Sequence, residues 1–134
     1  MQPRTKEAII ALLIEDGYLK TPAVIEAFRA IDRRDFVPAA VAGEAYTNHP
    51  LPIGVEQTIS QPLVTAFMLE LLAPQPGDKV LDIGAGSGWQ TALLAKIVTE
   101  GGVPGKVFAL ERIAKLADFA KENIAKSSIK IFMA

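Results

Sequence analysis

The sequence predicts an α/β fold with a parallel, doubly wound sheet, and three observations carry this prediction. An apolar strand runs into a glycine-rich turn that opens a helix, over residues 79–98. A second strand, a second helix and a third strand follow, up to residue 133. Half of the 134 residues are apolar, since the hydrophobic share is 50%. This is enough to bury the core that such a fold needs.

Composition excludes several classes of site and partner. The chain has no cysteine and one histidine, so thiolate sites are excluded and we expect no metal. A net charge of -1, with both signs mixed along the chain, offers no basic surface to nucleic acid. No apolar stretch approaches the roughly 20 residues that cross a bilayer, and the charged first helix is unlike a signal peptide. We therefore expect a cytoplasmic protein with neither a membrane nor a nucleic-acid partner.

Two helices are expected at the N-terminus. The first covers residues 4–15 and ends near Gly17, because glycine suits the position after a helix. The second begins at Thr21-Pro22, where proline suits the first turn and the threonine hydroxyl can cap it.

A long loop and a third helix follow. Glycine and proline punctuate residues 43–62, and the apolar residues of this segment favour an ordered loop. Pro62 is expected to open the helix, and the Ser60 hydroxyl lies where it can accept a backbone N–H. The buried stripe of this helix is predicted to comprise five apolar residues, Val64, Phe67, Met68, Leu71 and Leu72.

The rest of the chain alternates between strands and helices. Strands are predicted at 80–83, 107–110 and 129–133, and helices at 88–98 and 114–125. The chain is therefore expected to comprise a helical and loop region, 1–75, and the first half of a cofactor-binding sheet, 76–134.

The glycine-rich turn, residues 84–88, is called the glycine corner below. Its glycines follow the pattern Gly-x-Gly-x-Gly, and Trp89 occupies the place where a dinucleotide fingerprint has its third glycine. With Asp82 two residues before it, the corner is instead similar to the first motif of S-adenosylmethionine-dependent methyltransferases. Glycines let a cofactor approach the backbone, and the helix N-terminus favours a carboxylate. A purely structural turn, with Asp82 as a strand-end cap, stays open.

Glu111 adds a second observation. It follows the second strand, where an acidic side chain can accept hydrogen bonds from both hydroxyls of a ribose. The alternative is that Glu111 and Arg112 form a solvated ion pair at the end of the strand.

Further segments carry a resemblance to one family. They are residues 34–38 (Arg-Asp-Phe-Val-Pro), Tyr46, 50–54, 57–62, 76–84 and 111–112. Residues 57–62, Gln-Thr-Ile-Ser-Gln-Pro, are the most specific, since generic methyltransferases lack them. Over residues 5–126 the chain resembles the protein-L-isoaspartate O-methyltransferases, which repair damaged aspartyl and asparaginyl residues.

The resemblance implies S-adenosylmethionine as cofactor, and isoaspartyl-containing peptides and proteins as substrates. It implies that Ser60 is the active-site hydroxyl, while its interpretation as a helix cap stays open. Residues 57–59 are then expected to lie over cofactor and substrate. The cofactor-binding residues implied in this way are Gln57, Thr58, Ile59, Asp82, Gly84, Ala85, Gly86, Ser87, Gly88, Glu111 and Arg112.

The chain departs from the family pattern at its C-terminal end. The later strands, the adenine-contacting residues and a peptide-gripping loop have no counterpart. We therefore expect an incomplete Rossmann-like S-adenosylmethionine-dependent methyltransferase fold, with N-terminal helices and the first βαβαβ half of the sheet. Residues 80–83 then form an apolar sheet edge, which favours pairing with another chain. Two functions stay open: methyl transfer, or a non-catalytic truncated homologue that acts through self-association or partner binding.

Overall fold

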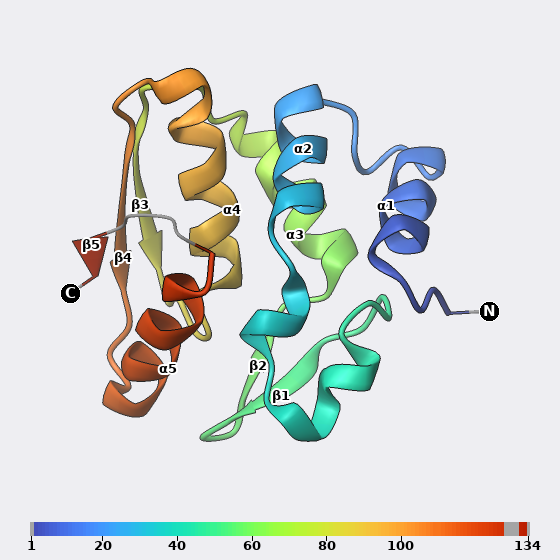
Figure 1. The fold of residues 1–134 in the computed structure, drawn as a ribbon, viewed down its shortest axis with the longest axis vertical. Coiled ribbons are helices and arrows are strands. Elements are labelled where there is room, and N and C mark those ends of the chain that lie inside the picture. The colour runs from blue at the N-terminus through green and yellow to red at the C-terminus, as the bar shows by residue number, and fades with distance from the viewer. Residues whose placement is uncertain (1, 128–131, 134) are drawn as a thin grey trace.

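The structure is a computed structural model that describes residues 2–127 and 132–133. A three-stranded parallel sheet lies at one side of the molecule (Figure 1). Its strands are β3 (Lys79–Ile83), β4 (Lys106–Leu110) and β5 (Phe132–Met133), in that order. Helix α4 (Trp89–Val98) connects β3 to β4, helix α5 (Ala114–Ala125) follows β4, and both lie on the same side of the sheet. The predicted α/β class is therefore confirmed.

The predicted elements of this half are confirmed to within a residue or two. Gly88 is the residue that precedes the first turn of α4. Phe132 and Met133 pair with Phe108 and Ala109 of β4. The predicted third strand is thus confirmed at these two residues, and its first part, residues 129–131, lies outside the described residues.

The two faces of the sheet differ in burial. Val107 and Ala109 point toward the helices and are buried. The opposite face is apolar and exposed, and it comprises Leu81, Ile83, Phe108 and Leu110. Within the described sheet, β3 is an edge strand, as predicted.

Three further helices lie beyond α4, on the side away from the sheet (Figure 1). They are α1 (Lys6–Glu15), α2 (Pro22–Ala30) and α3 (Pro62–Leu72). Helix α2 packs on α4, so that α4 lies between the sheet and α2 and is buried along nearly its whole length. The ring of Phe28 meets that of Trp89 edge to face, 5.6 Å between centroids. None of the helices in residues 2–127 is both long and apolar enough to cross a membrane.

Thr21 is the N-cap residue of α2, as expected, but its hydroxyl does not form the predicted cap hydrogen bond. Its hydroxyl donates to Glu70 Oε2 at 2.6 Å, and Glu70 Oε1 accepts the backbone N–H groups of Lys20 and Thr21 at 2.7 and 2.8 Å. The last turn of α3 thus supplies the carboxylate at the start of α2. Burial alone would raise the pKa of Glu70, but these hydrogen bonds outweigh burial and lower it below 4.5.

We expect Glu70→Ala to lower the free energy of unfolding by about 1 kcal/mol at pH 7, because the hydrogen bonds that fix the segment before α2 are lost. Because folding lowers the pKa of Glu70, its contribution is complete above the ordinary pKa of 4.5 and is lost as the pH falls through the lower, folded value. Urea denaturation at pH 7 and at pH 3 measures both effects. The exposed Glu26→Ala is the control. An equal loss in both variants at pH 7 would show that the hydrogen bonds of Glu70 do not stabilise the fold.

The predicted stripe of α3 is also wrong. Pro62, Thr65, Ala66 and Leu69 are the buried residues. The five residues predicted to be buried are 40–70% exposed instead. This helix is apolar around most of its circumference, so periodicity cannot select a face, and packing on α1 and α2 selects it. The exposed face borders β3 across a groove of about 550 Å³.

The segment expected to be an ordered loop contains a hairpin. Strands β1 (Leu51–Gly54) and β2 (Gln57–Ile59) pair antiparallel. Val55 and Glu56 form the turn with φ of 53° and 59°, the positive values that a two-residue hairpin turn requires. Short 3₁₀ helices at Arg33–Phe36 and Ala39–Glu44 precede it. The hairpin brings β2 and the start of α3 against the glycine corner (Figure 1).

Candidate functional site

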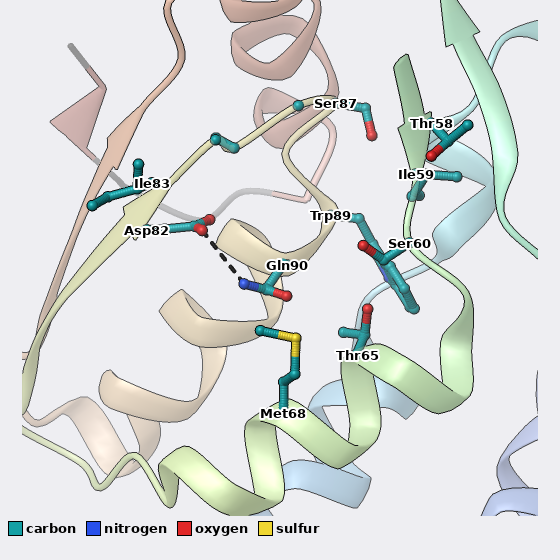
Figure 2. A pocket seen from close by; sticks show the side chains of 13 residues that line it. Thr58, Ile59, Ser60, Thr65, Met68, Asp82, Ile83, Ser87, Trp89 and Gln90 are labelled. Carbon is teal, nitrogen blue, oxygen red and sulfur yellow. Dashed lines mark hydrogen bonds between the residues drawn. The ribbon is translucent and has the colours of Figure 1, made fainter.

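Two adjoining cavities lie where the carboxyl ends of β3 and β4 meet the hairpin. The first has a volume of about 220 Å³, and its walls come from β2, the start of α3 and the β3–α4 connection (Figure 2). The second, of about 470 Å³, extends toward the end of β4. It shares four lining residues with the first: Thr58, Ile83, Gly84 and Gly86. The carboxyl end of parallel strands is the edge at which α/β sheets bind ligands.

The predicted site residues come together around these cavities, with one exception. The first cavity is lined by Thr58, Ile59, Ser60, Asp82, Gly84, Ala85, Gly86 and Ser87. The second adds Gln57, Glu111 and Arg112. Gly88 lines neither cavity and lies against α5, where an added Cβ would meet Ile124 Cδ1 at 2.9 Å.

Ser60 does not cap α3. The residue before the helix is Gln61, and Leu63 N–H donates to Asn48 Oδ1 at 3.0 Å instead. Ser60 is exposed, and its hydroxyl has no hydrogen-bond partner within the described part of the chain. Its side chain lies at the wall of the first cavity (Figure 2). The cap interpretation is therefore wrong, and the hydroxyl is available to a ligand.

Asp82 joins β3 to α4. It is buried, and its carboxylate accepts the Thr91 hydroxyl at 2.5 Å and the Gln90 amide at 3.4 Å (Figure 2 draws the second). Burial raises the pKa of Asp82, although these two hydrogen bonds oppose the rise. Its partners are side chains of the first turn of α4, so Asp82 holds the helix N-terminus beside the cavity.

The Glu111 side chain is hydrogen-bonded to the glycine corner. Its Oε1 accepts Gly86 N–H at 2.9 Å and its Oε2 accepts Ile113 N–H at 3.0 Å. Glu111 does not form the alternative ion pair with Arg112. The one salt bridge among the described residues joins Lys96 and Glu100. Each carboxylate oxygen has a second lone pair, so Glu111 can accept two further hydrogen bonds from a ligand.

Sequence reasoning missed Arg33, the buried cation behind Ser60. Its guanidinium donates to the carbonyls of Ala45 at 2.7 Å, His49 at 2.9 Å and Ser60 at 3.0 Å. Burial lowers the pKa of Arg33 to about 10. Its place in a run of four charged residues is typical of a solvated segment and gives no sign of burial.

The sequence also gives no sign of the role of Trp89. It stands where a dinucleotide fingerprint has a glycine, and in the fold it lines the first cavity beside Thr65, Met68 and Gln90. The hydrophobic pattern of α3 and α4 does not indicate which of their residues line the cavity, because both helices are apolar on several faces. Among the described residues, no three His, Cys, Asp or Glu side chains gather as metal ligands would.

Comparison with known proteins gives one family. The family model described as protein-L-isoaspartate(D-aspartate) O-methyltransferase matches residues 4–133. A protein-L-isoaspartate O-methyltransferase of Aeropyrum pernix is 49% identical over 122 residues, 91% of this chain and 46% of the relative. One of Pseudomonas paraeruginosa is 47% identical over 128 residues, 95% of this chain and 57% of the relative. The chain thus spans about half the length of the curated relatives it matches.

Solved structures agree with this relationship. A putative protein-L-isoaspartate O-methyltransferase from Plasmodium falciparum, in complex with S-adenosyl-L-homocysteine, has a TM-score of 0.83 at 26% identity, over 98% of this chain and 62% of that one. A second structure, named protein-L-isoaspartate O-methyltransferase, has a TM-score of 0.81 at 26% identity, over 97% of this chain and 41% of that one. These likenesses confirm the Rossmann-like methyltransferase fold, of which this chain holds part.

Proposed function

Because this chain belongs to the protein-L-isoaspartate(D-aspartate) O-methyltransferase family, we propose that its two cavities bind S-adenosylmethionine and an isoaspartyl carboxylate, and that it transfers the methyl group between them. The observation that carries this proposal is that the Ser60 hydroxyl and the glycine corner line the same cavity, the first, and face each other across it (Figure 2). The methyl ester of an isoaspartyl residue closes to a succinimide with loss of methanol and without further catalysis, which is the repair step. A cytoplasmic location stays a prediction.

Two features of the chain fit the cofactor. Gly84 has φ of +79°, and a Cβ placed on it would meet no atom within 4 Å, so ligand can approach the backbone there. Glu111 keeps acceptor capacity at the end of β4, where a ribose would lie. We propose that Gln57, Thr58, Ile59, Ala85, Ser87 and Arg112 complete the contacts. Bound S-adenosylmethionine supplies an electrophilic methyl group on sulfur.

The carboxylate that accepts the methyl group must be positioned, but it need not be activated. A carboxylate with an ordinary pKa near 4 is already ionised at neutral pH, so no general base is required. We propose that the Ser60 hydroxyl donates a hydrogen bond to the carboxylate and holds one oxygen in line with the methyl group. The hairpin and the start of α3 form one wall of this cavity, opposite the glycine corner.

The direct test is methyl transfer by the purified chain from labelled S-adenosylmethionine to an isoaspartyl peptide. The same peptide with an ordinary aspartyl residue is the control. We expect base-labile methyl esters on the isoaspartyl peptide alone. Binding of S-adenosylhomocysteine without any transfer would reject the catalytic half of the proposal and keep the cofactor half.

Ser60→Ala tests the assigned role. We expect kcat to fall about 10-fold, since one hydrogen bond of about 1.4 kcal/mol is lost, while affinity for S-adenosylhomocysteine stays within 2-fold. Ser127→Ala is the control, because the Ser127 hydroxyl only donates to the carbonyl of Ile124 at the end of α5. Unchanged kcat in Ser60→Ala would remove Ser60 from the catalytic site.

A second candidate function, self-association, rests on the open edge of β3. Ile83 is 75% exposed and Leu71 is 70% exposed, on the two sides of the groove between β3 and α3. An apolar sheet edge favours pairing with another chain. Light scattering during size exclusion tests this candidate, and Ile83→Lys is expected to abolish a dimer. A monomer at all concentrations would reject it.

A further inference from the structure

The buried guanidinium of Arg33 joins three parts of the chain that lie far apart in sequence. It is 2% exposed, and it donates to carbonyls of the loop before β1 (Ala45 and His49) and to the carbonyl of Ser60. Its Cζ lies 5.1 Å from the ring centroid of Trp89, the first residue of α4. Arg33 thus contacts both the Ser60 segment and the residue that follows the glycine corner.

This arrangement is not one that stability alone favours. Arg33 forms no ion pair among the described residues, so carbonyl dipoles and an aromatic ring face its charge. Its Nε has no hydrogen-bond acceptor there either. Burial of a cation without a counter-ion is costly, and an apolar side chain of similar size avoids that cost. The distinct property of the guanidinium is its planar fork, which binds several acceptors at fixed angles.

We infer that Arg33 is a positioning residue, which sets the place of the Ser60 hydroxyl relative to the glycine corner through the carbonyl of Ser60 and the ring of Trp89. The expected effect of Arg33 on kcat rests on the proposed function, whereas its expected effect on the Ser60 segment rests on geometry alone. Arg33 does not line the first cavity, whereas Ser60 and Trp89 both do. It therefore acts on a ligand through these two residues.

Arg33→Lys is the sharpest variant, because lysine keeps the charge and most of the aliphatic stem but has no planar fork. The neighbouring Arg34→Lys is the matched control, since the guanidinium of Arg34 also lies over a ring, 5.7 Å from the centroid of Tyr46, but is exposed. Trp89 is the single tryptophan of the chain, so its fluorescence reports contact with residue 33.

In Arg33→Lys we expect a shift of the Trp89 emission and faster hydrogen exchange at residues 57–61. Exchange at residues 84–88 and affinity for S-adenosylhomocysteine are expected to stay within about 3-fold. We expect kcat for an isoaspartyl peptide to fall about 10-fold or more, since small misplacement of a reacting group is costly. KM for S-adenosylmethionine is expected to change by less than 3-fold, and Arg34→Lys is expected to change none of these quantities.

Two outcomes would overturn the inference. One is unchanged exchange at residues 57–61 in Arg33→Lys. The other is exchange that rises equally at 57–61 and 84–88, together with an equal loss of cofactor affinity, which a merely structural role produces. If the parent chain transfers no methyl group, the proposed catalysis fails, and the exchange and fluorescence measurements decide on Arg33 by themselves. If Arg33→Lys does not fold, the same measurements are made on Arg33→Gln, which keeps a planar donor group.

Discussion

Glu111→Gln is expected to weaken the binding of S-adenosylhomocysteine about 100-fold, the equivalent of one hydrogen bond to a charged acceptor. The structure gives the reason for choosing glutamine. Both carboxylate oxygens of Glu111 accept backbone N–H groups, from Gly86 and Ile113. An amide has one oxygen, so its NH₂ group must face one of these donors. The glycine corner is then displaced, and an acceptor for the ribose is lost.

Calorimetric titration with S-adenosylhomocysteine measures the change, with adenosine as a second ligand that has the ribose without the amino acid part. We expect both ligands to lose affinity. Glu122→Gln, an exposed position on α5, is the control and should bind as the parent does. Loss of affinity for S-adenosylhomocysteine without loss for adenosine would place the ribose elsewhere.

The glycine corner and the strands beside it were predictable from sequence. Their signals are local, since an apolar strand, a glycine turn and a helix follow one another within residues 79–98. Once the strands are parallel, their carboxyl ends share one edge of the sheet. The sequence therefore places Asp82 and Glu111 close together without any knowledge of the other helices.

The place of Ser60 opposite this corner follows from the family resemblance and not from periodicity. No local pattern indicates that the hairpin folds back over the glycine corner. Its turn contains Val55 and Glu56 at positive φ, a conformation that β-branched residues rarely adopt. A turn without glycine or asparagine at its centre gives no hairpin signal, so the sequence predicts a loop there.

The remaining errors of the sequence-based prediction arise from tertiary packing. Helix α3 is apolar on several faces, and contact with α1 and α2 buries Thr65 in place of Phe67. Arg33 is buried because carbonyls from residues 45–60 converge on it. Such convergence between distant segments leaves no trace in a local window of sequence. Burial of a charged residue is therefore the part of this site that only the folded chain reveals.

Gly88→Ala is expected to lower the free energy of unfolding by about 2 to 3 kcal/mol, from backbone strain and overpacking together. Gly88 has φ of +94°, and its added Cβ would lie 2.9 Å from Ile124 Cδ1 and 3.2 Å from Ala120 Cβ, both on α5. Gly84→Ala is the matched comparison. Its φ of +79° carries the same kind of strain, but no atom lies within 4 Å of its added Cβ.

The two glycines should therefore separate stability from ligand binding. We expect Gly84→Ala to cost about 1 kcal/mol of stability and to weaken the binding of S-adenosylhomocysteine at least 10-fold, because its methyl group enters the cavity that the ligand would occupy. Gly88→Ala, with its larger cost in stability, should keep more of that affinity at a temperature where it is folded. Urea denaturation and calorimetric titration on the same two variants give both quantities. If affinity falls more in Gly88→Ala than in Gly84→Ala, the ligand lies against α5 rather than over the end of β3.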